Sequence, residues 1–80
     1  MSHKTWVELG DHRPGLHLLV YRGPTNAAGQ LTEKPDQLHD VKLSQGAVIA
    51  EELRALGFRA LPDTQRNTAY GKAWDVEEAG

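Results

Sequence analysis

The aromatic and acidic residues of this chain are the ones best suited to binding a protein partner. Large amphipathic rings anchor protein interfaces, because they combine apolar area with a polar tip. The candidate anchors are Trp6, Tyr70 and Trp74. Acidic side chains speed the encounter with a basic partner, and the candidates for this role are Glu51, Glu52, Asp75, Glu77 and Glu78. Together these residues predict a partner-binding surface.

Catalytic chemistry finds little support in the residue types. The chain has no cysteine, and Ser44 is better explained as a helix cap than as a nucleophile. Glu51 and Glu52 are adjacent in a predicted helix, so their carboxylates point in different directions. We therefore expect no catalytic residues and no enzyme activity.

Cofactor and metal sites are also poorly supported. The Gly-Lys pair at residues 71–72 is followed by alanine, which does not complete a phosphate-binding loop. No two histidines have the helical spacing of a zinc hydrolase. Asp11, His12 and His17 could approach one another across a hairpin, which keeps a small enzyme or metal protein as a third possibility. Our expectation is no cofactor and no metal.

The alternative function is a small nucleic-acid-binding domain. Arg59, Arg66, Lys72 and Tyr70 bring basic and aromatic residues together in the last third of the chain. That combination binds single strands, because the charges follow the phosphates and the rings stack on bases. The acidic residues that follow cancel the local charge, and the net charge of the chain is −2. Direct nucleic-acid binding is therefore less favoured than binding to a protein.

Hydrophobic periodicity predicts strands at both ends of the chain. Thr5–Leu9 alternates, Leu16–Arg22 is rich in leucine, valine and tyrosine, and turn residues join the two segments, which indicates a hairpin. Phe58–Leu61 and Thr68–Val76 are predicted as the last two strands. Between the first and last strands, His39–Leu43 is predicted as a short strand.

The segment 23–38 is harder to assign. It is interrupted by proline and glycine, and an unstructured segment of this length is unusual in a small domain. We expect a long excursion that is pinned to the rest of the fold by Leu31 and Leu38.

The best-supported element is a helix from Ser44 to Gly57. Ser44 suits the N-cap position, and Leu43 and Val48 have the spacing of a hydrophobic staple. Gly57 is typical of a left-handed residue that ends a helix. Apolar residues recur at helical spacing at Ile49, Leu53 and Leu56.

The alternation within Thr68–Val76 predicts which face the helix covers. Gly71 and Ala73 are small and share one face, which would let a helix approach closely. Tyr70 and Trp74 share the other face, which we expect to be outside or to close a second small cluster.

These elements predict an α+β fold in which one helix packs on a mainly antiparallel sheet of four or five strands. The whole chain, residues 1–80, is expected to form a single domain. The first residues precede no apolar stretch, so the expected location is the cytoplasm, or the cytoplasm of a host cell.

In its overall profile the chain resembles small phage-encoded inhibitors, among them anti-CRISPR proteins. The shared features are small size, slight negative charge, and the lack of cysteine and of catalytic motifs. The resemblance implies a steric inhibitor that covers a site on a large host nucleic-acid-processing complex. The expected partner is therefore a protein and not a membrane, and the chain is expected to be a monomer or a weak homodimer.

Overall fold

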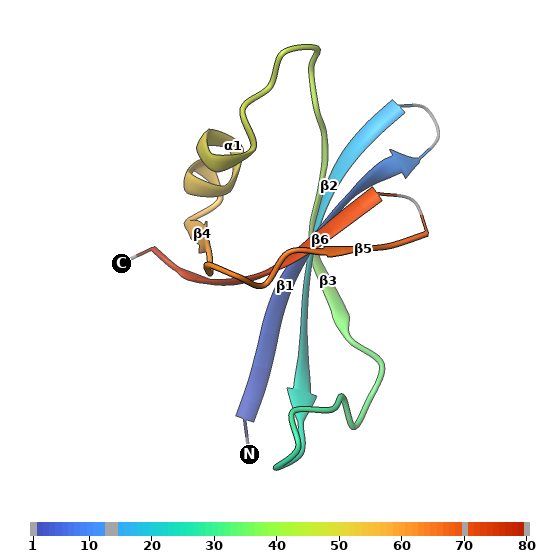
Figure 1. Ribbon diagram of the computed structural model, residues 1–80, viewed down its shortest axis with the longest axis vertical. Coiled ribbons are helices and arrows are strands. Elements are labelled where there is room, and N and C mark those ends of the chain that lie inside the picture. Colours follow the sequence, from blue (N-terminus) through green and yellow to red (C-terminus); the bar gives the residue numbers. More distant parts are fainter. Residues whose placement is uncertain (1, 13–14, 70, 80) are drawn as a thin grey trace.

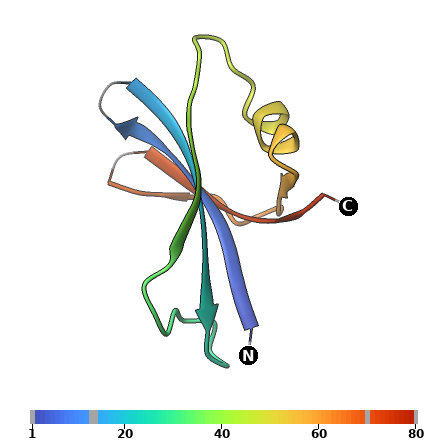
Figure 2. The same ribbon diagram turned by 180° about the vertical axis from the view of Figure 1, so that it is seen from behind.

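The computed structural model describes residues 2–12, 15–69 and 71–79, without the side chain of His12, and it has the α+β architecture predicted from the sequence. An antiparallel sheet of six strands carries one short helix on one of its faces (Figures 1 and 2). In chain order the elements are β1 (Ser2–His12), β2 (Gly15–Thr25), β3 (Asp36–Lys42), α1 (Ile49–Ala55), β4 (Phe58–Ala60), β5 (Arg66–Asn67) and β6 (Gly71–Glu78).

Neighbouring strands lie in the order β3-β2-β1-β6-β4, and the short β5 also pairs with β6. The predicted first hairpin is confirmed, since β1 and β2 pair without interruption from Ser2 opposite Thr25 to His12 opposite Gly15. The pairing of β2 with β3 shifts register around Leu38, which marks a bulge in the outer strand. The sheet exceeds the expected four or five strands because the last hairpin contributes β5 as a separate short strand.

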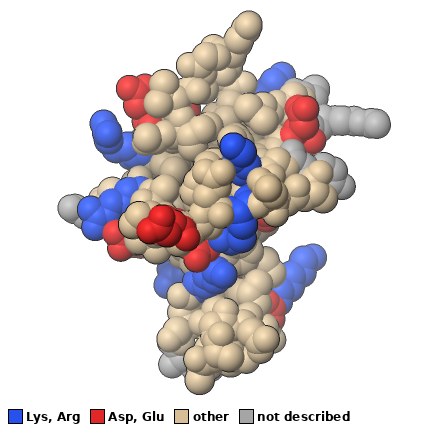
Figure 3. All heavy atoms as spheres, viewed as in Figure 1, with Lys and Arg blue, Asp and Glu red and all other residues tan. Residues whose placement is uncertain are grey.

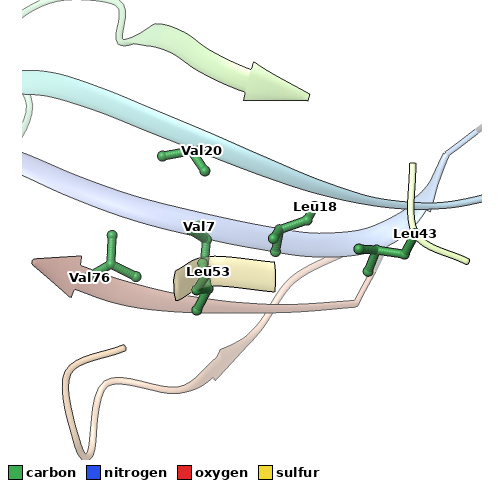
Figure 4. Packing of buried hydrophobic residues seen from close by; sticks show 6 residues of the cluster. All are labelled: Val7, Leu18, Val20, Leu43, Leu53 and Val76. Carbon is green, nitrogen blue, oxygen red and sulfur yellow. The ribbon is translucent and has the colours of Figure 1, made fainter. Parts of the chain in front are cut away.

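The hydrophobic core lies between the sheet and α1 (Figure 4). Leu53 is the buried residue of the helix. It packs with side chains from β1, β2, β6 and the segment after β3, namely Val7, Leu18, Val20, Val76 and Leu43. We call this side of the sheet the helix face. The other side, which carries Trp6, Leu19, Tyr21, Ala73 and Asp75, is called the open face.

The start of the predicted helix is wrong by about one turn. α1 begins at Ile49, its N-cap is Val48, and no side chain caps it. Ser44 instead begins a tight turn in which Ala47 N donates to Ser44 O. The reason is tertiary, because the chain leaves the edge of the sheet after Leu43 and must cross over the helix face before a helix can dock. The predicted staple is also absent, since Val48 is 54% exposed.

The predicted orientation of the last strand is also wrong. Trp74 is opposite Val7 in register and packs against the core, so it lies on the helix face. Ala73 is buried on the open face. Both faces of β6 carry apolar residues. The larger side chains, Trp74 and Val76, face α1 because they fill the space between the sheet and the helix.

The excursion before β3 is shorter than the expected segment 23–38, because β2 continues to Thr25 and β3 begins at Asp36, and the leucines of the expected segment are only partly covered. Leu31 and Leu38 are 41% and 43% exposed. Leu31 nevertheless forms a bridge with Thr25, and a Cβ at Gly23 would meet its side chain at 2.8 Å. The loop is therefore held against the end of β2 by Leu31. Within the described ranges, no helix has both the length and the apolar character needed to cross a membrane.

The sheet splits between its two central strands. Pairing of β1 with β6 ends at Trp6 opposite Asp75, although β1 continues to Ser2 and β6 to Glu78. Beyond that pair the two strands diverge, and the C-terminal part of β6 curves toward α1 (Figures 1 and 2). The divergence creates two separate surfaces, one under the helix and one along the free edge of β1.

Candidate functional site

A groove of about 530 Å³ lies between α1 and the strands at the C-terminal end. Its apolar lining includes Ile49 and Leu53 of α1, Phe58 of β4, and Trp74 of β6. Ile49, Phe58 and Trp74 are only half-buried. The groove is thus a part of the core that the short helix leaves open.

Gly57 explains how the groove forms. It adopts a φ of 89°, the left-handed conformation predicted at the end of the helix. Gly57 N donates to Arg54 O at 3.0 Å, and the chain then turns directly into β4. This sharp reversal places Phe58 under the helix, where its ring makes an edge contact with His39 at 6.3 Å.

The groove is bordered by charges of both signs. Arg54 and Arg59 line it, and Arg59 Nε lies 2.6 Å from Glu77 Oε1. Glu51 and Glu52 lie in the first turn of α1, and Glu78 is opposite Phe58 in register. Across the described chain, these three glutamates form no ion pair. The groove therefore has more uncompensated negative than positive charge around it.

An aromatic pair lies on the open face. The rings of Trp6 and Tyr21 stack with their centroids 5.5 Å apart, and Trp6 Nε1 donates to Glu8 Oε2 at 3.3 Å. Burial raises the pKa of Tyr21 above 10.0, and the nearby carboxylates of Glu8 and Asp40 raise it further. Trp6 is buried, so it packs under Tyr21 as part of the fold and offers little surface to a partner.

Two basic side chains share one carboxylate next to Trp6. Asp75 Oδ1 lies 3.0 Å from Arg66 Nη1 and 3.8 Å from Lys4 Nζ. A recess of about 360 Å³ is lined by Lys4, Trp6, Leu31 and Arg66. A second recess of about 340 Å³ also borders Lys4 and lies in the split between β1 and β6. Two cations therefore share the Asp75 carboxylate in this region.

The structure brings together only some of the predicted binding residues. Trp74 lines the groove under α1, and four predicted acidic residues belong to the two elements beside it, Glu51 and Glu52 to α1 and Glu77 and Glu78 to β6. Trp6 and Asp75 lie on the opposite face of the sheet. Tyr70 is outside the described residues. The predicted residues therefore belong to two surfaces and not to one.

The basic residues of the nucleic-acid alternative do not form a continuous basic surface. Arg59 and Arg66 are bound to Glu77 and Asp75, respectively. Lys72 is exposed in β6. On the side of the molecule seen in Figure 3, basic and acidic side chains are interspersed across the middle of the protein.

The residues considered for a metal site were Asp11, His12 and His17, and the side chain of His12 lies outside the described part. His17 Nδ1 lies 2.6 Å from Asp40 Oδ1. Where side chains are described, no group of three or more histidine, aspartate or glutamate residues could hold a metal ion.

Sequence reasoning missed the apolar walls of the groove and the role of Lys4. Phe58 is expected from its place after Gly57 to fold back on Leu53, and Ile49 and Leu53 to lie on the core side of a helix, but nothing in this pattern predicts that an open groove remains between them. The sequence signal for Phe58 is its place directly after Gly57, where a left-handed residue turns the chain back. No comparable signal marks Lys4, because its contact with Asp75 joins strands far apart in the chain.

Comparison of the chain with protein-family models, with curated protein sequences and with solved structures finds no significant match. The function must therefore be inferred from the geometry of this chain.

Proposed function

We propose that this chain is a non-enzymatic protein-binding domain whose groove under α1 receives apolar side chains from a basic segment of its partner. The observation that carries this proposal is the open apolar groove of about 530 Å³ beside Leu53, Phe58 and Trp74. Binding pockets commonly have volumes of roughly 300–1,000 Å³. Filling the groove would remove apolar surface from water on both molecules, at about 25 cal/mol per Å².

The charges around the groove support a basic partner segment. Glu51, Glu52 and Glu78 form no ion pair within the described chain, and they flank the groove on α1 and at the end of β6. Lysine or arginine next to the apolar anchor would lie near these carboxylates. Charges at the rim of an interface mainly increase the association rate and the selectivity.

The polar groups that line the groove are suited to holding a ligand. Arg54 and Arg59 are its charged lining residues among those described. A guanidinium stays protonated at neutral pH, so it donates hydrogen bonds but does not exchange protons as a general acid or base would. This composition supports a binding role.

A narrower form of the proposal is an inhibitor that acts in the cytoplasm of a host cell. In this form, α1 and the end of β6 would cover a basic channel of a large nucleic-acid-processing complex, as inhibitors of the anti-CRISPR type do. Trp74 would contribute to the groove that receives the anchor, and Glu51, Glu52 and Glu78 would occupy the place of phosphates. A complex recovered with the protein should then lose its nucleic-acid binding when the protein is added back.

The groove can be tested by filling it. Ala50 lines the groove and is exposed at its mouth, whereas Ala55 is exposed on the same helix and does not line it. Ala50→Trp should block the groove, and Ala55→Trp is the matched control because it adds the same ring to the same helix. A displayed library of random peptides can be selected against the wild-type protein and then measured against both variants.

We expect the selected peptides to carry an apolar residue next to lysine or arginine. Their affinity should fall about tenfold or more with Ala50→Trp, a loss of about 1.4 kcal/mol, and should not change with Ala55→Trp. Peptides that bind both variants equally, or a selection that enriches no sequence, would refute the groove as the binding site.

A further inference from the structure

We infer that the free edge of β1 at Ser2–Thr5 is a second binding site, which takes an extended acidic segment of a protein partner as an added strand. This site lies across the sheet from the groove under α1 and does not depend on it. Three observations coincide there. The strand edge has no partner among the described strands, a recess that includes Thr5 and Lys4 runs along it, and an adjoining recess on the open face is lined by Lys4 and Arg66.

The backbone groups at this edge point away from the rest of the sheet. Successive residues of an antiparallel strand direct their N–H and C=O groups to alternate neighbours. Leu43 N donates to Leu16 O, so the even-numbered residues of β2 face β3 and its odd-numbered residues face β1. By register, the even-numbered residues of β1 then face β2. His3 and Thr5 therefore direct their backbone groups into the split.

β6, on the other side of the split, does not pair with this part of β1. Leu61 N donates to Asp75 O and Ala79 N donates to Gly57 O, so the odd-numbered residues of β6 face β4. The pairing of β1 with β6 nevertheless ends at Trp6 opposite Asp75. A recess of about 340 Å³ separates Thr5 from Leu61 in this region. The inferred strand would lie next to β1 in this recess, at the usual spacing of about 4.8 Å.

The side chains at the edge favour an acidic segment. A residue added opposite Lys4 would point its side chain to the open face, within about 5 Å of Lys4. Lys4 and Arg66 both lie within ion-pair distance of the carboxylate of Asp75, while the Glu8 carboxylate on the same face accepts a hydrogen bond from Trp6. A glutamate at that position would add a second carboxylate next to Lys4 and Arg66, which share Asp75, and Trp6 and Leu31 in the adjoining recess would contact its aliphatic part.

The outer edge of β3 is a poorer place for strand addition. Its pairing with β2 shifts register around Leu38, which indicates a bulge. Bulges twist an edge strand and interrupt the regular series of free backbone groups. The pairing of β1 with β2 is uninterrupted, so the free edge of β1 offers a regular template. Added strands gain affinity from main-chain hydrogen bonds and selectivity from side-chain pockets.

The test uses a fluorescein-labelled peptide, Thr-Val-Thr-Glu-Thr-Val-Thr, and a second peptide with lysine in place of glutamate. Binding to the full chain is measured by fluorescence anisotropy. His3→Pro removes an outward N–H without touching the β1–β2 ladder, and proline is tolerated in edge strands. His3→Val keeps that N–H and is the matched control, while Lys4→Glu reverses the charge in the recess. Thermal unfolding of each variant verifies that it is folded.

We expect the glutamate peptide to bind at least about tenfold more tightly than the lysine peptide, and His3→Pro to weaken it by about tenfold, while His3→Val does not. Lys4→Glu should reverse the preference between the peptides, and Ala50→Trp in the groove should leave both affinities unchanged. No binding to the wild type, equal binding of the two peptides, or an unchanged affinity in His3→Pro would overturn the inference. Concentration-dependent dimerisation that His3→Pro abolishes would overturn it in favour of pairing between two copies of this chain.

Discussion

The hydroxyl of Thr64 takes the place of a backbone group opposite Asp75. Asp75 N donates to Thr64 Oγ1 at 3.1 Å, and Thr64 Oγ1 lies 2.8 Å from Leu61 O, to which it donates. Residues 61–65 lie between β4 and β5, the two short strands that pair with β6. The hydroxyl supplies a hydrogen-bond acceptor for β6 in this interval, where neither strand does so. Thr64 thus holds β6 at the point where the strand turns from the sheet toward the groove.

Thr64→Val should destabilise the fold without changing its shape. The substitution keeps the branched side chain but leaves the N–H of Asp75 and the carbonyl of Leu61 without this partner, at a cost of about 1–3 kcal/mol. In a domain of this size each kcal/mol lowers the Tm by roughly 4–8 °C. Thermal unfolding followed by circular dichroism measures the change. Thr64→Ser keeps the hydroxyl and should stay closer to the wild type; equal Tm values for Thr64→Val and wild type would contradict the bridging role.

Gly71→Ala should be strongly destabilising because β1 and β6 approach closely at this point. Gly71 is opposite Gly10, and a Cβ at Gly71 would lie 2.1 Å from the carbonyl oxygen of Leu9. Backbone must move to admit the methyl group, and such overpacking costs about 1–3 kcal/mol or more. Urea unfolding measures the loss. Lys72→Ala is the control, since this neighbour is exposed; a Gly71→Ala variant as stable as Lys72→Ala would show that the strands do not meet here.

The parts of the fold that depend on local signals are the ones the sequence predicted. The β1–β2 hairpin follows from alternation and turn residues, and the end of the helix follows from Gly57, whose φ is 89°. The start of the helix depends on where the chain can cross the sheet after Leu43. Ser44 has the side chain of a good cap, but it lies too early on that path for the helix to begin there.

The binding surfaces were harder to predict, because both depend on contacts between distant segments. The alternation in the last strand separates Trp74 from Ala73, but it does not say which of them faces the helix. The split between β1 and β6 depends on where their pairing stops, and nothing in the sequence around Trp6 marks that point. The candidate residues were therefore assigned to one surface, although the sheet separates Trp6 from Trp74.

Leu53→Ala tests whether α1 is fixed mainly by one side chain. Leu53 is the buried residue of the helix and packs in the central cluster. Such truncations cost about 2–5 kcal/mol, a large part of the roughly 4–12 kcal/mol expected for a chain of this length. Urea unfolding with matched m-values should show this loss. Leu16→Ala is the control, because Leu16 is 41% exposed and its truncation should cost less than about 1 kcal/mol. Similar losses in both variants would contradict the core assignment.

Tyr21 should make the stability of the fold depend on alkaline pH. Burial and the nearby carboxylates raise its pKa in the folded protein above 10.0, so folding favours the neutral phenol. The unfolded chain then releases the proton at lower pH than the folded chain. The contribution of the neutral phenol to stability is therefore complete below about pH 10 and is lost as the pH rises through the folded pKa.

The comparison that isolates this effect is Tyr21→Phe, which keeps a ring to stack on Trp6 but cannot ionise. Urea unfolding at about pH 9 and about pH 11 should show that the wild type loses more stability over this interval than the variant. Lysines also titrate in this range, but they contribute equally to both proteins, so the difference reports Tyr21. An equal loss in the two proteins would mean that the phenol is as well solvated in the fold as in the unfolded chain, and that the open face does not bury it.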